Sequence, residues 1–185
     1  MRSLLLAVAI GLVGAALLHI VIILALPSLS ARDAHARVFE LYEMDSFFQL
    51  TRRPGPTGLS NGDPFLRVAV CGYSVKEGPV RFYAEGPVPL WSLGVFDSRS
   101  NEVFSMNDRT AVDRRLDLVV ATPAQLVALR KSLPPGLEKS ILVEHADDEG
   151  FAVLRALAPT ESYEEEARQF LTEAVCEPLL LEPQN

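Results

Sequence analysis

The strongest candidate for a ligand-binding set in this sequence is the group Trp91, Asn107, Asp108 and Arg109. If the apolar segments 90–96 and 102–106 pair as a hairpin, the polar triplet emerges at the end of that hairpin, near the indole. An aromatic ring beside a guanidinium, an amide and a carboxylate could bind a sugar or a peptide. The residue types favour another interpretation, a turn in which Asn and Asp side chains bond their own backbone. Convergence of the four side chains on one open hollow would distinguish the two.

Sequence signatures of catalysis do not occur in the chain: it contains no glycine-rich phosphate loop, no nucleophile elbow and no zinc-protease motif. Only three histidines are present, and one of them, His19, lies in a long apolar stretch. His145 precedes Asp147 and Asp148, which could bind a metal weakly, but an acidic turn between two strands explains this trio better. We therefore expect no metal and no cofactor, and the sequence favours a protein that is not an enzyme.

Two cysteines, Cys71 and Cys176, stand far apart in the chain. In an oxidising compartment two lone cysteines in one domain are candidates for a disulfide. The alternative is a pair of buried free thiols. Because Cys176 follows a predicted C-terminal helix, a disulfide would connect that helix to the first strand of the domain.

Strand patterns occupy most of the chain after residue 63, and turn residues separate them. In residues 80–84, Val80, Phe82 and Ala84 alternate with Arg81 and Tyr83, as expected for a strand with one buried face. The other predicted strands are residues 65–73, 90–96, 102–106, 116–121, 140–144 and 151–157. Their short spacing predicts an antiparallel meander or partial barrel.

Two helices are predicted, one between the strands 116–121 and 140–144 and one after the last strand. Thr122, Pro123 and Gln125 form a capping box with proline at the first helical position, so a helix should run to about residue 131. Ser162 and Glu165 resemble a second capping box, which predicts a final helix to about residue 175 with the buried stripe Tyr163, Ala167, Phe170, Leu171 and Ala174. The fold class expected is α+β, with these two helices covering the sheet.

The N-terminal stretch, residues 4–26, contains no charged side chain. As a helix it would be about 34 Å long, enough to cross a hydrocarbon core of about 30 Å. The alternative is a cleaved secretory signal, with cut sites after Ser30 or Ala31. The apolar run of residues 4–26 is longer than the apolar core of a signal peptide, so an uncleaved anchor is the favoured interpretation. We expect a break near Pro27 and then a helix to about residue 45 whose stripe, Ala34, Val38, Leu41 and Tyr42, docks on the domain or lies on the bilayer.

Small residues recur every four positions within this stretch, at Ala7, Gly11 and Ala15, and His19 continues the same face. Small residues at this spacing allow close approach of a second membrane helix. An imidazole in lipid is costly unless it finds a partner. Ordinary membrane composition with a locally bonded, neutral His19 is the alternative, and a proton relay is a third. The packing face predicts a membrane-protein partner.

Charge and composition limit the remaining possibilities. The chain has 17 basic and 24 acidic residues, and only Arg2 precedes residue 32, so the rest carries a net charge of −8. This balance disfavours nucleic acid as a partner. We expect a short tail and anchor in residues 1–31, a juxtamembrane helix and Pro/Gly linker in residues 32–62, and a periplasmic β-rich domain in residues 63–185. A three-residue tail before the span usually stays in the cytoplasm, which places the anchor in the inner membrane.

Four segments carry a family resemblance: Asp63-Pro-Phe-Leu-Arg-Val-Ala-Val-Cys71, Gly78-Pro-Val-Arg81, Pro89-Leu-Trp-Ser92 and Phe104-Ser-Met-Asn107-Asp-Arg-Thr110. Together with the helix ending at Cys176, they make residues 60–177 similar to the family called domain of unknown function twelve-fifty-four. The family consists of small, single-span bacterial envelope proteins, whose members often sit beside a twelve-fourteen partner. The resemblance implies a β-rich fold and a membrane location, but no reaction.

Overall fold

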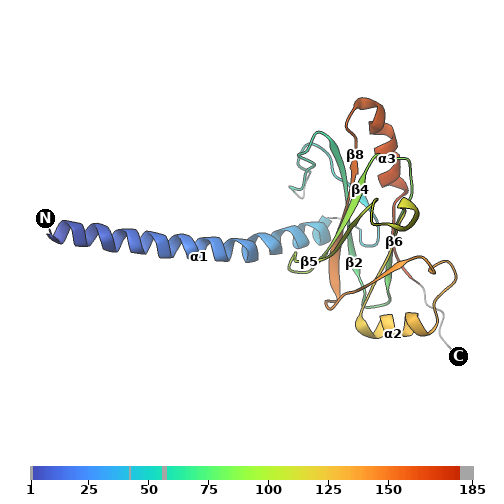
Figure 1. Cartoon of the computed structure of the whole chain (residues 1–185), viewed down its shortest axis with the longest axis horizontal. Helices are drawn as coiled ribbons and strands as arrows, with labels where there is room; N and C mark the ends of the chain where they lie inside the picture. Colours follow the sequence, from blue (N-terminus) through green and yellow to red (C-terminus); the bar gives the residue numbers. More distant parts are fainter. Residues whose placement is uncertain (1, 42, 56–57, 180–185) are drawn as a thin grey trace.

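The computed structural model of the chain describes residues 2–41, 43–55 and 58–179. Within these described residues, nine strands form two sheets that face each other, and one very long helix projects away from them (Figure 1). The α+β class, the N-terminal apolar helix and the antiparallel character expected from the sequence are all confirmed.

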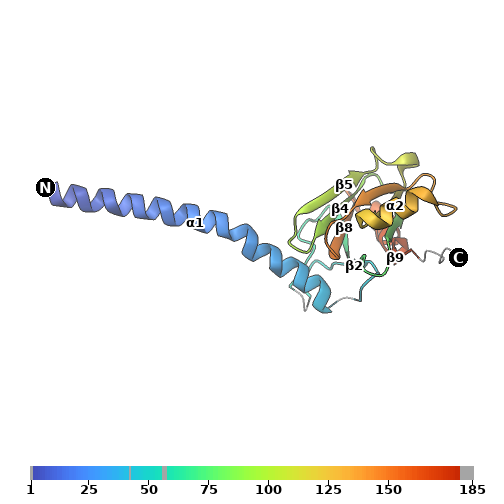
Figure 2. The ribbon, with the colours of Figure 1, turned by 90° about the horizontal axis from the view of Figure 1, so that it is seen from below.

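Helix α1 (Arg2–Leu41) runs without interruption from the apolar stretch to the β domain, so the predicted break near Pro27 is wrong at the level of secondary structure. The helix bends along its length instead (Figure 2), as expected where a proline removes an internal hydrogen bond. Its first part, Arg2–Leu26, is long and apolar enough to cross a membrane or to act as a secretory signal. The most apolar part of this segment is not buried against the rest of the protein.

The C-terminal part of α1 docks on the domain. Val38 is only 2% exposed and packs against Val70 and Phe151, with Ala34 and Phe39 beside them. The predicted docking stripe is thus confirmed for Ala34 and Val38. Tyr42 and the side chain of Leu41 lie outside the described residues.

The five-stranded sheet is antiparallel throughout and has the order β1-β2-β8-β4-β5. Its strands are β1 (Phe48–Gln49), β2 (Leu66–Ser74), β4 (Trp91–Asp97), β5 (Glu102–Asn107) and β8 (Glu149–Leu157). Two neighbouring pairs in this sheet follow each other directly in the described chain: β1 with β2, and β4 with β5, the predicted hairpin. Helix α1 covers the outer face of β2 and β8.

The four-stranded sheet has the order β7-β6-β3-β9, and its single parallel pair is β6 with β7. Its strands are β3 (Val80–Ala84), β6 (Leu116–Ala121), β7 (Ile141–Glu144) and β9 (Val175–Pro178). Helix α2 (Pro123–Lys131) connects the parallel pair and covers Val119 and Ala121 on the outer face. Figure 2 shows β9 and α2 on the side of the domain away from α1.

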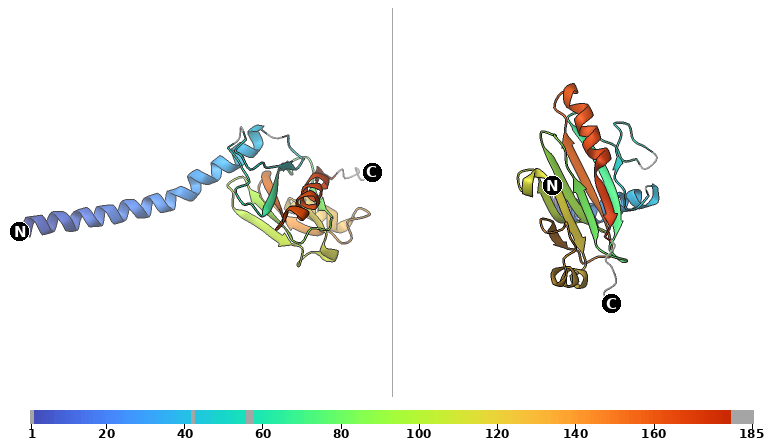
Figure 3. Two further views of the ribbon diagram at one scale, coloured as in Figure 1. Left: turned by 90° about the horizontal axis from the view of Figure 1, so that it is seen from above. Right: turned by 90° about the vertical axis from the view of Figure 1, so that its right-hand side faces the viewer.

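Helix α3 (Glu164–Glu173) closes the space between the sheets with Ala167, Phe170 and Leu171, and Figure 3 shows it lying along one side of the strands. The core itself consists of the inward residues of both sheets, including the predicted set Val80, Phe82 and Ala84. Two short 3-10 turns, η1 (Val112–Arg114) and η2 (Glu161–Tyr163), complete the fold.

Three details differ from the sequence expectations. A simple meander requires consecutive strands to be antiparallel neighbours, but in the described residues this holds only for β1 with β2 and for β4 with β5, because the other strands alternate between the sheets or pair in parallel. The predicted Ser162 capping box does not form, because α3 begins at Glu164, after Tyr163, without a side-chain cap. The last helix also ends early: Ala174 is extended and Cys176 belongs to β9, paired opposite Phe82.

Candidate functional site

Trp91 lies on the inward face of β4, where only 2% of it is exposed. Its ring stacks on Phe170 of α3, with 6.5 Å between ring centroids. The indole Nε1 donates a hydrogen bond to the backbone carbonyl of Arg114 over 2.9 Å. Trp91 therefore belongs to the core, and its indole holds the turn at η1 through this hydrogen bond.

Asp108 is also buried, with 5% exposed, just beyond the end of β5. Its Oδ2 forms an ion pair with the guanidinium of Arg114 over 2.8 Å, and its backbone amide donates to the carbonyl of Trp91. The second carboxylate oxygen, Oδ1, is buried and has no hydrogen-bond partner among the described residues. A buried carboxylate is costly unless it is paired, so Asp108 depends on Arg114.

Asn107 and Arg109 lie in the turn itself. The Asn107 Oδ1 accepts hydrogen bonds from the backbone amides of Arg109 and Thr110, the self-bonding turn that the residue types favour. The Arg109 side chain is exposed. The four predicted residues are thus neighbours at one corner of the fold, but two point into the protein and one bonds its own turn. They do not converge on one open hollow.

The turn that Trp91 and Asp108 support has an unusual backbone. Asp113 and Arg114 are consecutive non-glycine residues with φ of 54° and 58°, in the left-handed region that side chains other than Asn and Asp seldom adopt. Such strain persists only where surrounding contacts hold it. Here the contacts are the Trp91 indole, the Asp108 carboxylate, and a hydrogen bond from Arg114 to the carbonyl of Pro89.

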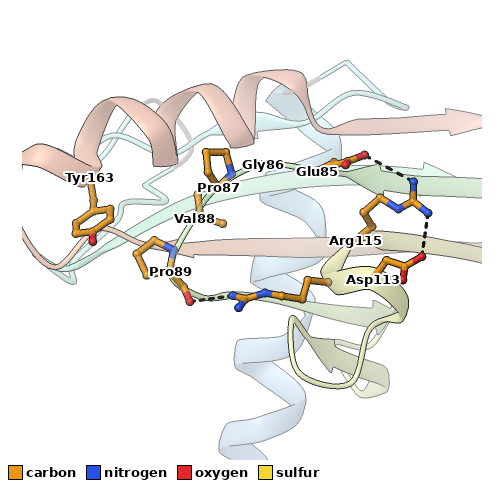
Figure 4. Close-up of a pocket in the computed structure, with 9 residues that line it drawn as sticks. Glu85, Gly86, Pro87, Val88, Pro89, Asp113, Arg115 and Tyr163 are labelled. Atoms are coloured by element: carbon orange, nitrogen blue, oxygen red, sulfur yellow. Dashed lines mark hydrogen bonds and ion pairs between the residues drawn. The ribbon is translucent and has the colours of Figure 1, made fainter.

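A hollow of about 630 Å³ lies directly over this turn, lined by residues 85–89, residues 113–115 and Tyr163. Figure 4 shows two kinds of wall. Pro87, Pro89 and Tyr163 form an apolar side, while Arg115 lies between Glu85 and Asp113 on the other. Tyr163 is 37% exposed, so its ring is accessible.

A second hollow of about 550 Å³ shares Arg115 with the first and extends over the outer face of the four-stranded sheet. The Arg81 guanidinium donates two hydrogen bonds of 3.0 Å to the Asp117 carboxylate and lies over the ring of Tyr83. The hydrogen bond from Tyr83 to Glu85 raises the pKa of the phenol. Lys139 lowers the pKa of Asp113 by hydrogen bonding to its carboxylate. We call the two hollows together the Arg115 groove.

The remaining predicted site residues lie elsewhere. Cys71 of β2 and Cys176 of β9 form the predicted disulfide, which joins the two sheets rather than a helix and a strand. Ala7, Gly11, Ala15 and His19 lie on exposed positions of α1. A Cβ added to Gly11 would meet no atom within 4 Å.

His145 is fully buried, and its Nε2 lies 3.3 Å from the carbonyl of Glu149, whereas Asp147 accepts a hydrogen bond from Ser98. Within the described residues, no three His, Cys, Asp or Glu side chains are grouped as a metal would require.

Fold and site together define a two-sheet domain that carries a polar groove and is joined to a long apolar helix. No protein-family model matches the sequence, and no curated protein matches it. Two solved structures share the fold. The VPA0106 protein from Vibrio parahaemolyticus has a TM-score of 0.60 at 13% identity, over 84% of this chain and 37% of its own. An uncharacterised protein from Burkholderia cenocepacia has a TM-score of 0.50 at 14% identity, over 87% of this chain and 44% of its own. This chain therefore spans less than half the length of either.

Proposed function

We propose that this chain is a membrane-anchored interaction or accessory protein of the bacterial cell envelope, without catalytic activity. Its β-rich domain lies in the periplasm beside the inner membrane. The observation that carries the proposal is the continuity of α1, in which one helix contains both the apolar stretch and the turns that pack on β2 and β8. The disulfide supports an oxidising compartment.

An anchor is favoured over a cleaved signal because of where the helix packs. Cleavage after Ser30 or Ala31 would cut α1 ahead of its docked turns, which contain the buried Val38. The freed helix would keep only about eleven residues, a length that is marginal for a helix, whereas the uncleaved chain continues it without interruption. The intact mass of the purified protein tests this point, since an anchored chain keeps its N-terminal residues.

The partner is a second membrane protein that packs on Ala7, Gly11, Ala15 and His19. Small side chains along this face allow close backbone contact, and a donor or acceptor from the partner would satisfy the imidazole. The domain leaves this part of α1 uncovered.

The length of the structural neighbours supports a partner outside the membrane too. Both have the fold of this chain within a protein that is about twice as long or longer. We infer that this chain supplies one domain of a larger assembly, as its resemblance to the twelve-fifty-four family and that family's twelve-fourteen neighbours implies.

Affinity purification of the full chain in mild detergent tests the packing face. The Ala15→Leu variant places a large side chain on it, and Ala9→Leu makes the same change outside this face, about 120° around the helix from Ala15. We expect a co-purifying membrane protein to be lost with Ala15→Leu and retained with Ala9→Leu. Equal recovery with both variants would remove the packing face, and recovery of no membrane protein with the unchanged chain would remove the accessory role.

A further inference from the structure

We propose that the Arg115 groove binds a chain of neutral sugar residues. The inference goes beyond the role of the anchor and rests on different residues. It starts from the shape of the groove: two hollows of about 630 and 550 Å³ share one guanidinium, so the groove suits a ligand longer than a single ring.

The charge of the groove favours a neutral ligand. Its lining contributes four basic and four acidic side chains, and they neutralise one another in pairs such as Arg115 with Glu85 and Arg81 with Asp117. A polyanion would meet as much repulsion as attraction, because electrostatic complementarity requires an excess of one sign. What remains is a dense array of fixed hydrogen-bonding groups.

These groups match the hydroxyls of a sugar. Carboxylates accept two hydrogen bonds and guanidinium groups donate several in one plane, so a carboxylate beside a guanidinium can hold a pair of neighbouring hydroxyls. Glu85 and Arg115 lie in this way at the junction of the two hollows, with ends only 3.8 Å apart. Both side chains are partly exposed and so can reach a ligand.

The apolar wall matches the other side of a sugar ring. Tyr163, Pro87 and Pro89 present flat, rigid surfaces that lose little conformational freedom on binding. A pyranose has one face of C–H groups that can lie on such a surface while its hydroxyls point to the polar wall. The combination of an aromatic platform with a few convergent polar groups is typical of small-molecule sites.

Buried contacts also fix the position of this site. The strained residues Asp113 and Arg114 are held by the buried Trp91 and Asp108, and this puts Arg115 at the meeting point of the two hollows. Strain of this kind concentrates at functional sites. The second hollow lies on the sheet opposite the one that α1 covers, so it faces away from the anchor.

Saturation-transfer NMR on the full chain tests the proposal. The detergent should be zwitterionic, since sugar-headed detergents would compete. The probes are two neutral tetrasaccharides, β-1,4-linked glucose and β-1,4-linked N-acetylglucosamine, with tetragalacturonate as the anionic counterpart and a proline-containing tetrapeptide. We expect transfer to at least one neutral tetrasaccharide and none to tetragalacturonate or the peptide.

Tyr163→Ala should weaken the neutral tetrasaccharide at least ten-fold, whereas Phe65→Ala, which removes an exposed ring outside the groove, should not change its affinity. Should Tyr163→Ala unfold the domain, the exposed Glu85→Gln gives the same test. Ala15→Leu should leave sugar binding intact, which separates this site from the anchor's partner. Binding of the peptide or the anionic probe alone, no transfer to either neutral sugar, or equal affinity in the groove variants would each overturn the proposal.

Discussion

The two outer faces of the sandwich differ in what their strands present. On the five-stranded sheet, Val70, Phe151 and Val153 point outward, and the last turns of α1 cover them. On the four-stranded sheet, α2 covers Val119 and Ala121, but Arg81 and Asp117 occupy the outward positions beside it. On both sheets a helix covers the apolar outward positions, whereas the charged outward positions of the four-stranded sheet stay uncovered.

Loss of the disulfide should have the largest effect, and it should affect both faces alike because Cys71 and Cys176 join the two sheets. The bond closes a loop of 105 residues, and the chain-entropy model gives about 4–5 kcal/mol of stabilisation for that length. We expect the double variant Cys71→Ala/Cys176→Ala to lose most of this free energy of unfolding in urea. Hydrogen exchange should rise in β2 and β3 together, and a rise in one sheet alone would contradict a shared role.

Truncating one aromatic side chain on each face tests the comparison directly. Phe151 is 7% exposed and stacks on Phe96, with 5.0 Å between centroids, whereas Tyr83 is partly exposed. Phe151→Ala should cost about 3 kcal/mol of unfolding free energy, and Tyr83→Ala less than about 1 kcal/mol. Phe151→Ala should also loosen α1, which limited proteolysis near residue 43 can detect. Equal costs for the two variants would break the comparison.

The turn beneath the first hollow contains an ion pair whose carboxylate is buried. Arg114→Ala leaves the carboxylate of Asp108 buried without its partner, which should cost about 1–3 kcal/mol. Alanine keeps a Cβ, so the left-handed backbone strain remains and the ion pair is the main change. Arg109→Ala in the adjacent turn is the matched control, with an expected change within about 0.5 kcal/mol. If both variants unfold at the same urea concentration, Asp108 does not need Arg114.

Local signals explain what the sequence could predict about these faces. The capping box of Thr122 and Gln125 forms with both of its hydrogen bonds, and α2 has its expected bounds. The alternation in β3 correctly separates its buried from its outward residues. Each of these features depends on residues within a few positions of one another, where propensity and pattern act directly.

Long-range pairing explains what the sequence missed. The helical pattern continues to about Val175, but the helix ends before Ala174, because Val175 and Cys176 pair with β3 as part of β9. Ser162 resembles a helix cap, yet it lies inside the 3-10 turn η2, and its hydroxyl is hydrogen-bonded to that of Thr160, the residue before the turn. The order of strands in each sheet also depends on contacts between distant segments, which spacing alone does not encode.

In the candidate site, too, the sequence indicated residue types but not the long-range contacts that decide their roles. Trp91 and Asp108 attract notice as residue types, but their contacts make them supports for a turn rather than ligand-binding groups. Arg115 was missed because its position depends on the left-handed backbone at Asp113 and Arg114, for which no glycine signal exists. The hint in the sequence was an acidic residue followed by two arginines, Asp113-Arg114-Arg115.

The smallest effect concerns two aspartates whose surroundings push their pKa values in opposite directions. Asp45, at the junction between α1 and β2, has a pKa raised by burial and by the nearby Glu77. Asp113, beside the open face, has a pKa lowered by its hydrogen bond to Lys139. Both have positive φ, which asparagine tolerates, so Asp→Asn isolates the charge at each position.

The two substitutions should have opposite signs at neutral pH. A raised pKa means that folding disfavours the charged form of Asp45, so its contribution is favourable in acid and is lost as pH rises through the folded value. Asp45→Asn should therefore stabilise the chain at pH 7 and give no gain below about pH 4. For Asp113 the contribution is present at neutral pH and lost as pH falls through the folded value, so Asp113→Asn should destabilise slightly at pH 7 and less in acid. Urea unfolding at pH 3.5 and pH 7 measures both, and shifts of the same sign would mean that the covered and open faces impose the same environment on a carboxylate.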